Sequence, residues 1–193
     1  MTTSISSGWE RVAMAIQDVR ERLLRSTAVF EAAKVPYAVA GGNAVAEWVG
    51  RVDQAAVRFT QDVDLLIRRA DLPRAIEAMQ AAGFIFHKSF GVSLFLDGPQ
   101  GSPRDAVHLV FSGEKVKEQE PLPAPDVTDS ESAEHFQVVS LESLVTMKLT
   151  AFRRKDQVHL LDMLGVGLID ASWLARLPAP LAERLQELIE HPE

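Results

Sequence analysis

The sequence contains no cysteine, which excludes disulfides and thiolate metal sites. No apolar run reaches the roughly 20 residues that span a bilayer. Residues 1–7 lack the basic start and apolar core of a secretory signal. With 47% hydrophobic and 24% charged residues, the 193 residues are typical of a globular protein. We therefore expect one cytoplasmic domain over residues 1–193, without membrane contact.

Basic residues are also few: 20 stand against 27 acids, for a net charge of −7. This balance argues against a broad surface that coats nucleic acid. The charge is concentrated in the proline-rich segment 113–135, where seven acids and two lysines give −5, so the rest of the chain carries only −2. We expect this segment to be a surface excursion, either a solvated loop or a dock for a basic partner. A local basic groove elsewhere is compatible with these numbers.

Apolar spacing and turn residues predict an α/β (α+β) fold with a small mixed sheet. Residues 1–139 would form the α/β core with an N-terminal helix, and residues 140–193 a helical C-terminal part. We expect the helices to lie on one side of the sheet. The predicted strands are 37–40, 63–67, 84–87, 93–96 and 106–111; the predicted helices are 9–34, 44–49, 71–82, 141–152, 156–164 and 181–190.

Two of the predicted helices carry specific expectations. In the helix 9–34, an apolar stripe that starts at Trp9 and Val12 and runs to Leu23 and Phe30 would cover one face of the sheet. In the helix 44–49, the preceding Asn43 would be the N-cap.

Asp62 and Asp64 are the centre of the functional argument. Residues i and i+2 of a strand point to the same face, about 6.6 Å apart. Two carboxylates so placed beside an apolar strand repel each other, and a divalent cation removes that cost. Oxygen ligands suit Mg²⁺ or Mn²⁺. The alternative is that they are two exposed acids at the start of a strand.

Gly41 and Gly42 stand between a predicted buried strand and a helix start. Backbone N–H groups in such a turn can hold a phosphate at the positive end of the helix. The alternative is a tight turn that needs a positive φ. The order strand, Gly-Gly, helix, then a strand with Asp-x-Asp is much more specific than either pair alone.

These residues carry a family resemblance. The stretches Tyr37-Ala-Val-Ala-Gly-Gly-Asn-Ala-Val-Ala and Arg58-Phe-Thr-Gln-Asp-Val-Asp-Leu-Leu resemble the signature of the nucleotidyltransferase (DNA polymerase β-like) superfamily. The Arg-x-Thr-x-Asp-x-Asp form, with the stretch from Leu144 to Asp162, resembles the branch of minimal nucleotidyltransferases and AbiEii-type toxins. The resemblance covers about residues 36–165, and it is not specific for a substrate.

The resemblance implies a nucleotidyltransferase fold and roles for particular residues. Gly41, Gly42 and the adjoining Asn43 would hold the nucleoside triphosphate (NTP), and Asp62 and Asp64 would bind Mg²⁺ or Mn²⁺. The metal would stabilise in-line attack on the α-phosphorus while pyrophosphate leaves. The residues expected to border the nucleotide are Arg58, which could meet phosphate oxygens, Thr60 and Lys155.

His108 departs from the family pattern, because active members have a third carboxylate on a neighbouring strand. Asp105 lies three residues away and would face oppositely in a regular strand. A neutral His can act as a base but is a poor Mg²⁺ ligand. Either His108 is the base of a one-metal site, or the protein binds nucleotide without transfer, or His108 is a half-buried strand residue.

Lys148 lies on the apolar stripe of the helix 141–152, at i+4 from Leu144 and i+3 from Val145. It must snorkel to solvent or reach a polar cavity, where phosphates or the Asp pair would satisfy it. Lys155, Asp156 and Asp162 follow in the same pattern, as substrate contacts, as groups supporting the site, or as helix-surface salt bridges.

Two functions follow. The first is a metal-dependent nucleotidyltransferase that moves a nucleotide from an NTP to an RNA (in one version tRNA), a protein hydroxyl or a small molecule. Its AbiEii-like form would have an antitoxin-like protein partner. The second is a catalytically degenerate module of the same fold that binds a nucleotide or a partner.

Overall fold

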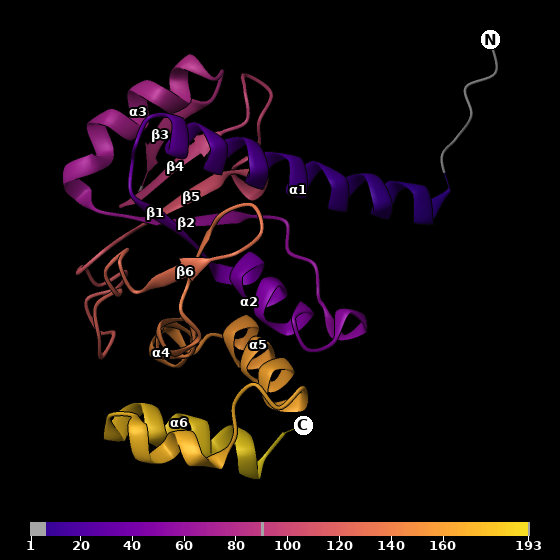
Figure 1. The fold of residues 1–193 in the computed structure, drawn as a ribbon, viewed down its shortest axis with the longest axis vertical. Coiled ribbons are helices and arrows are strands. Elements are labelled where there is room, and N and C mark those ends of the chain that lie inside the picture. The colour runs from indigo at the N-terminus through magenta and orange to yellow at the C-terminus, as the bar shows by residue number, and fades with distance from the viewer. Residues whose placement is uncertain (1–6, 90, 193) are drawn as a thin grey trace.

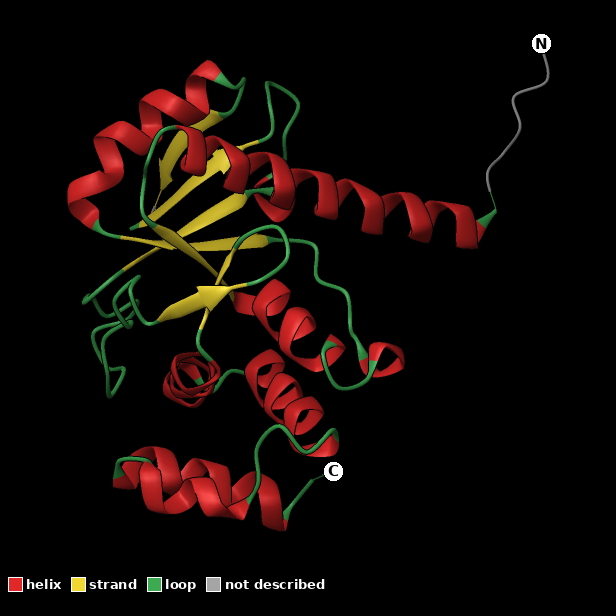
Figure 2. Cartoon of the chain, in the orientation of Figure 1, coloured by secondary structure: helices red, strands yellow, loops and turns green. Residues whose placement is uncertain are grey.

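The computed structural model describes residues 7–89 and 91–192, which form a mixed sheet flanked by helices (Figures 1 and 2). The expected fold class is confirmed. The seven strands have the order β3-β4-β5-β2-β1-β7-β6. The strands are β1 (Tyr37–Ala40), β2 (Val63–Ile67), β3 (Ile85–Ser89), β4 (Val92–Leu96), β5 (Val107–Phe111), β6 (Ser130–Ser132) and β7 (Gln137–Val139); the helices are α1 (Gly8–Ala32), α2 (Gly41–Gly50), α3 (Leu72–Ala81), α4 (Leu141–Ala151), α5 (Arg154–Gly165) and α6 (Ala179–Glu190).

Strand direction brings three chain segments to one edge of the sheet. β1 runs antiparallel to β2, and β2 runs parallel to β5. The end of β1 therefore lies beside the starts of β2 and β5. In this register Ala40 pairs with Asp64, and Asp64 pairs with His108. Residues 24 and 44 positions apart in sequence thus form one row across the sheet.

The helices cover both faces of the sheet, so the expectation of helices on one side was wrong. Val39 and Leu65 face α1 and α3, where they pack with Phe30 in one hydrophobic cluster. Ala38 and Leu66 face the other way and pack in a second cluster with α2, α4, α5 and α6. The central strands are apolar on both faces because both are covered.

Helix α1 is longer than the sheet that it crosses. Ser7 caps it in a capping box with Glu10, and it ends at Ala32, two residues before the predicted end. Its 25 residues span about 38 Å at 1.5 Å per residue. The N-terminal half extends beyond the sheet (Figure 1), with Trp9 85% exposed. Only the C-terminal part of the predicted stripe, with Phe30, covers the sheet.

The acidic segment 113–135 is more integrated than a surface excursion. It contains β6, and Ala124 and Val127 are buried. Two of its acids form ion pairs with the turn after β2: Asp126 binds Arg68 at 2.6 Å, and Glu114 binds Arg69. These contacts hold part of the segment against the body, while residues 115–119 are exposed as expected for a surface excursion. The short strand β7 was not predicted.

Within residues 7–89 and 91–192, no helix combines the length and hydrophobicity needed to cross a membrane.

Candidate functional site

The strand row Ala40–Asp64–His108 places the candidate site on the face covered by α2, α4 and α5. Asp64 and His108 share this face with Leu66 and Val110, because alternate residues of a strand point the same way. The predicted neighbourhood of the Asp pair and His108 is therefore present in the structure.

Gly41 makes the closest approach to Asp64. Helix α2 begins at Gly41 directly after β1, with Ala40 as N-cap, and Gly41 has φ +64°. A Cβ built on Gly41 would lie 1.8 Å from Oδ2 of Asp64. On Gly42, it would lie 2.8 Å from Cβ of Thr60. Both positions need glycine for space, and Gly41 also for its backbone conformation.

Asn43 is not the N-cap that we expected. It lies within the first turn of α2, and its Nδ2 donates a hydrogen bond to the backbone oxygen of Asp62 at 2.9 Å. The helix starts earlier than predicted because Gly41 can adopt a positive φ directly after the strand. Asn43 thereby ties the Gly-Gly turn to the Asp-x-Asp segment.

The two carboxylates have opposite electrostatic environments. Thr60 Oγ1 donates to Asp62 Oδ1 at 2.5 Å, and Lys155 Nζ lies 3.4 Å from Oδ2. Burial acts to raise the pKa of Asp62, but the Thr60 hydrogen bond and the Lys155 charge outweigh it, so the pKa is lowered. Burial and then the charge of Asp62 raise the pKa of Asp64.

A single divalent cation fits this donor set. Mg²⁺ takes oxygen ligands and is often held by one or two carboxylates together with substrate phosphates. Asp62 and Asp64 provide two such carboxylates, and a cation would relieve the cost of burying Asp64 beside a second acid. The part of the chain that the structure describes has no cluster of three or more His, Asp or Glu that could hold a metal.

His108 occupies the third position with a nitrogen ligand in place of an acid. Its Nε2 lies 3.1 Å from the backbone oxygen of Pro103. Asp105 lies in a 3-10 turn, Pro103–Asp105, before β5 begins. His108 lines both an open hollow of about 430 Å³, shared with Asp62 and Arg104, and a narrower cavity of about 220 Å³, shared with Asp64.

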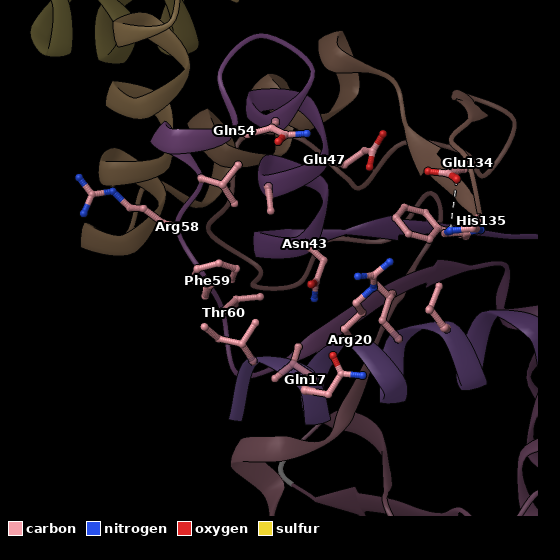
Figure 3. Close-up of a pocket in the computed structure, with 18 of the residues that line it drawn as sticks. Gln17, Arg20, Asn43, Glu47, Gln54, Arg58, Phe59, Thr60, Glu134 and His135 are labelled. Atoms are coloured by element: carbon pink, nitrogen blue, oxygen red, sulfur yellow. Dashed lines mark ion pairs between the residues drawn. The ribbon is translucent and has the colours of Figure 1, made fainter. Parts of the chain in front are cut away.

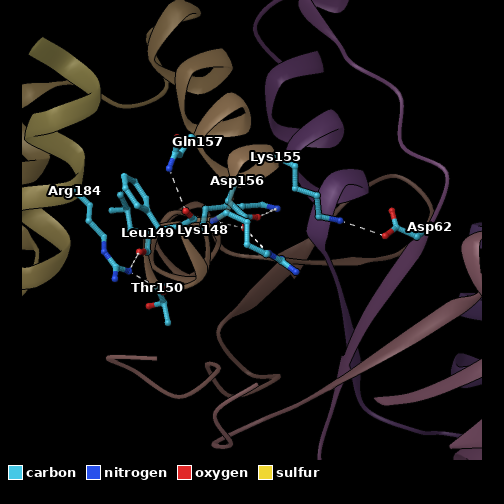
Figure 4. Close-up of polar contacts among 10 residues, drawn as sticks. Asp62, Lys148, Leu149, Thr150, Lys155, Asp156, Gln157 and Arg184 are labelled. Carbon is cyan, nitrogen blue, oxygen red and sulfur yellow. Dashed lines mark hydrogen bonds and ion pairs between the residues drawn. The ribbon is translucent and has the colours of Figure 1, made fainter. Parts of the chain in front are cut away.

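Lys148 is buried, only 4% exposed, and forms an ion pair with Asp156 (Figure 4). Nζ lies 2.9 Å from Oδ1, while Arg153 Nε lies 2.8 Å from Oδ2. Lys148 therefore does not snorkel, and its direct partner is Asp156 and not the Asp pair. It still lines the cavity with Asp64 and lowers the pKa of that carboxyl, against burial and Asp62.

A left-handed residue explains how this cluster forms. Phe152 has φ +47° and ends α4, and α5 starts again at Arg154. Asp156 lies in the first turn of α5, where it also accepts a hydrogen bond from the backbone N–H of Arg153. Burial acts to raise the pKa of Asp156, but Arg153 and Lys148 outweigh it and lower the pKa.

Arg58 forms an ion pair with Asp162 of α5, with Nε 2.8 Å from Oδ2. Its side chain is 64% exposed, so the predicted phosphate contact would have to compete with this pair. A hollow of about 560 Å³, larger than the two that His108 lines, lies between α1 and α2 and includes Arg58, Thr60 and Asn43 (Figure 3). Neither Asp62 nor Asp64 lines it, so size does not identify the site.

Two contributors were missed by sequence reasoning. Residues of the acidic segment between 116 and 124, Glu120 among them, form one wall of the narrower cavity. The clustered prolines gave no sign of a wall of the site. Arg104 lines the open hollow, and its guanidinium has no hydrogen bond or ion pair with any described residue. Its place next to the strand of His108 was the only available signal.

The structure thus brings the Gly-Gly turn after β1 against the Asp-x-Asp segment of β2. The chain belongs to a family described as uncharacterised nucleotidyltransferases, whose model matches residues 4–142. No curated protein matched the sequence.

A solved structure of low sequence identity shares this fold. An antigenic nucleotidyltransferase-like protein from Paracoccidioides brasiliensis is 17% identical with a TM-score of 0.61; the match covers 91% of this chain and 89% of that one. ANT(2″)-Ia in complex with adenylyl-2″-tobramycin is 14% identical with a TM-score of 0.45, over 92% and 90% of the chains.

Proposed function

We propose that the protein transfers a nucleotide from an NTP to a hydroxyl acceptor, with one Mg²⁺ or Mn²⁺ held by Asp62 and Asp64. The observation that carries the proposal is the contact between Gly41 and Asp64. It leaves no room for a side chain where a phosphate would reach the metal ligands. Family membership supports nucleotide transfer as the reaction class.

In this proposal, the backbone N–H groups of Gly41 and Gly42 bind triphosphate oxygens at the positive end of α2. The metal, when bound, neutralises phosphate charge. The acceptor hydroxyl attacks the α-phosphorus, its proton passes to the imidazole of His108, and the bond to pyrophosphate breaks. Lys155 holds Asp62 and contacts the phosphates, and Lys148 lies beside Asp64.

The acceptor that we favour is an RNA, with tRNA as one case. The hollow that contains Asp62 and His108 is open, and the unpaired Arg104 lies on it. An open hollow admits a chain end, and a cation at its rim suits a phosphate backbone. A protein hydroxyl is the alternative acceptor. An AbiEii-like toxin role with an antitoxin-like partner rests on the stretch Leu144 to Asp162, and growth arrest on expression, relieved by Asp64→Asn, would support it.

The direct test incubates the protein with each labelled NTP, Mg²⁺ or Mn²⁺ and total RNA. We expect label in RNA with at least one NTP, and none with Asp64→Asn. A folded protein that labels no RNA and no protein would contradict the proposal.

His108 supports a second candidate, a nucleotide-binding module without transfer. That candidate predicts that an NTP raises the melting temperature without turnover, and that His108→Asp creates activity. If the wild type transfers and His108→Ala abolishes the transfer, the second candidate is wrong.

A further inference from the structure

The narrower cavity of about 220 Å³ has a mixed lining that suits a nucleoside better than phosphates. Its walls include Val116 and Leu122 of the acidic segment and Met147 and Ala151 of α4. Gly41 and Asp64 line the same cavity. A nucleoside held here would have its 5′ phosphates within reach of the proposed phosphate and metal groups. Apolar walls with a few polar groups are typical of small-molecule sites.

Two polar side chains in this cavity, Thr150 and Glu120, have no side-chain hydrogen-bond partner among the described residues. Thr150 is only 7% exposed, and its hydroxyl has no hydrogen-bond partner among the described residues. Buried hydroxyls are normally paired, because an unpaired one costs about 1–3 kcal/mol. Glu120 is half-buried, and its carboxylate accepts no hydrogen bond from any described residue.

Four other charged groups of the cavity, Lys148, Arg153, Lys155 and Asp156, are already paired, and Asp64 is the proposed metal ligand. Asp156 binds both Lys148 and Arg153, and Lys155 binds Asp62. Burial acts to lower the pKa of Arg153, but Asp156, Asp64 and Glu120 outweigh it and raise the pKa. Glu120 lines the same cavity as Arg153. Its carboxylate has no hydrogen bond or ion pair with any described residue, so it remains available to a ligand.

We propose that this cavity binds the nucleoside of the NTP, and that Glu120 and Thr150 select guanine. The inference rests on the proposed function and adds the base. An ionised carboxylate only accepts hydrogen bonds. Guanine presents two adjacent donors, N1–H and the 2-amino group, which match the two carboxylate oxygens. Uracil presents a single ring N–H between two carbonyls. The Thr150 hydroxyl can donate to a guanine acceptor.

Inosine triphosphate (ITP) tests this directly, because it differs from GTP only in lacking the 2-amino group. In calorimetric titrations with MgCl₂, we expect wild-type protein to bind GTP about tenfold more tightly than ITP, as for one hydrogen bond to a charged group. Glu120→Gln should reduce this ratio to about twofold or less. Glu118→Gln is the matched control, since Glu118 is exposed on the same segment and does not line the cavity.

Thr150→Val is a second variant, for which we expect opposite effects on stability and on GTP binding. Removal of an unpaired buried hydroxyl should leave the melting temperature equal or higher, while GTP binding becomes about tenfold weaker. Equal GTP and ITP affinities in wild type, tightest binding of UTP, or an unchanged ratio in Glu120→Gln would overturn the base assignment and leave nucleotide transfer intact. Absence of binding by every NTP would overturn both.

Discussion

Replacement of Gly41 by alanine tests whether the Gly-Gly turn is shaped around Asp64. The added Cβ would lie 1.8 Å from Oδ2 of Asp64 and 2.6 Å from its Cγ. Asp64 is fixed between β1 and β5, so it can yield only by leaving its position. Overpacking of this kind costs about 1–3 kcal/mol. The positive φ adds about 1–2 kcal/mol for an L-residue. Gly41→Ala should therefore lower the free energy of unfolding by about 2–5 kcal/mol.

Gly83→Ala is the matched control. Gly83 has φ +88° and nothing within 4 Å of a built Cβ, so alanine there meets the backbone penalty alone, about 1–2 kcal/mol. Urea unfolding of both variants separates the steric contact from the backbone term. In an Asp64→Ala background, the extra cost of Gly41→Ala over Gly83→Ala should become smaller without vanishing. The contacts at 1.8 Å and 2.6 Å are removed, but the Cβ of residue 64 still lies 2.9 Å from the added Cβ.

Function should separate the two variants more sharply than stability. Displacement of a metal ligand by about 1 Å is expected to reduce transfer about 100-fold. We expect this loss in Gly41→Ala and near-wild-type transfer in Gly83→Ala at a temperature where both are folded. Equal unfolding free energies for the two variants, together with full activity of Gly41→Ala, would refute the reasoning.

Three further predictions concern the charged groups around the site. Lys148→Met leaves Asp156 with Arg153 alone and should lower the free energy of unfolding in urea by about 2–3 kcal/mol. Lys155→Met removes the half-exposed ion pair with Asp62 and should lower it by about 1 kcal/mol or less. Equal losses for the two variants would contradict a buried Lys148–Asp156 pair. Burial, then the charge of Lys148, lowers the pKa of His159 to about 4. As pH falls below about 6.5, the unfolded chain binds this proton more readily than the folded protein, so the free energy of unfolding decreases until about pH 4. After discount for partial exposure, we expect wild type to lose about 1–2 kcal/mol more than His159→Asn between pH 7.5 and pH 4.5, and parallel pH profiles would exclude the effect. Burial and then the charge of Asp62 raise the pKa of Asp64, so stability is lost as pH rises above the pKa that Asp64 has in the unfolded chain. Asp64→Asn should therefore raise the melting temperature at pH 7; a lower melting temperature, or a gain that persists below pH 3, would contradict this prediction.

The sequence allowed prediction of the parts of the site that depend on local geometry. Asp62 and Asp64 are two residues apart at the start of a strand, and Gly41 and Gly42 stand at a strand–helix junction. These inferences use residues within a few positions of one another. His108 was expected beside them because the family resemblance places a third carboxylate there, and it pairs with Asp64.

Features that depend on distant contacts could not be predicted in this way. Residues 116–124 line the cavity because Ala124 and the ion pairs of Glu114 and Asp126 hold the segment against the sheet. The place of Lys148 on an apolar stripe indicated that its charge needs a polar partner or solvent. Its partner Asp156 depends on the left-handed Phe152, which periodicity does not show. The three-residue strand β7 is too short for a pattern of alternation.

A titration of NTP binding with MgCl₂ tests the central claim most directly, with GTP as the probe. If Asp62 and Asp64 hold one cation shared with the phosphates, wild-type affinity for GTP should increase at least about tenfold as Mg²⁺ is added. Asp64→Asn should abolish this increase. Binding that is equally tight without Mg²⁺ and in Asp64→Asn, or no binding in either condition, would contradict the account.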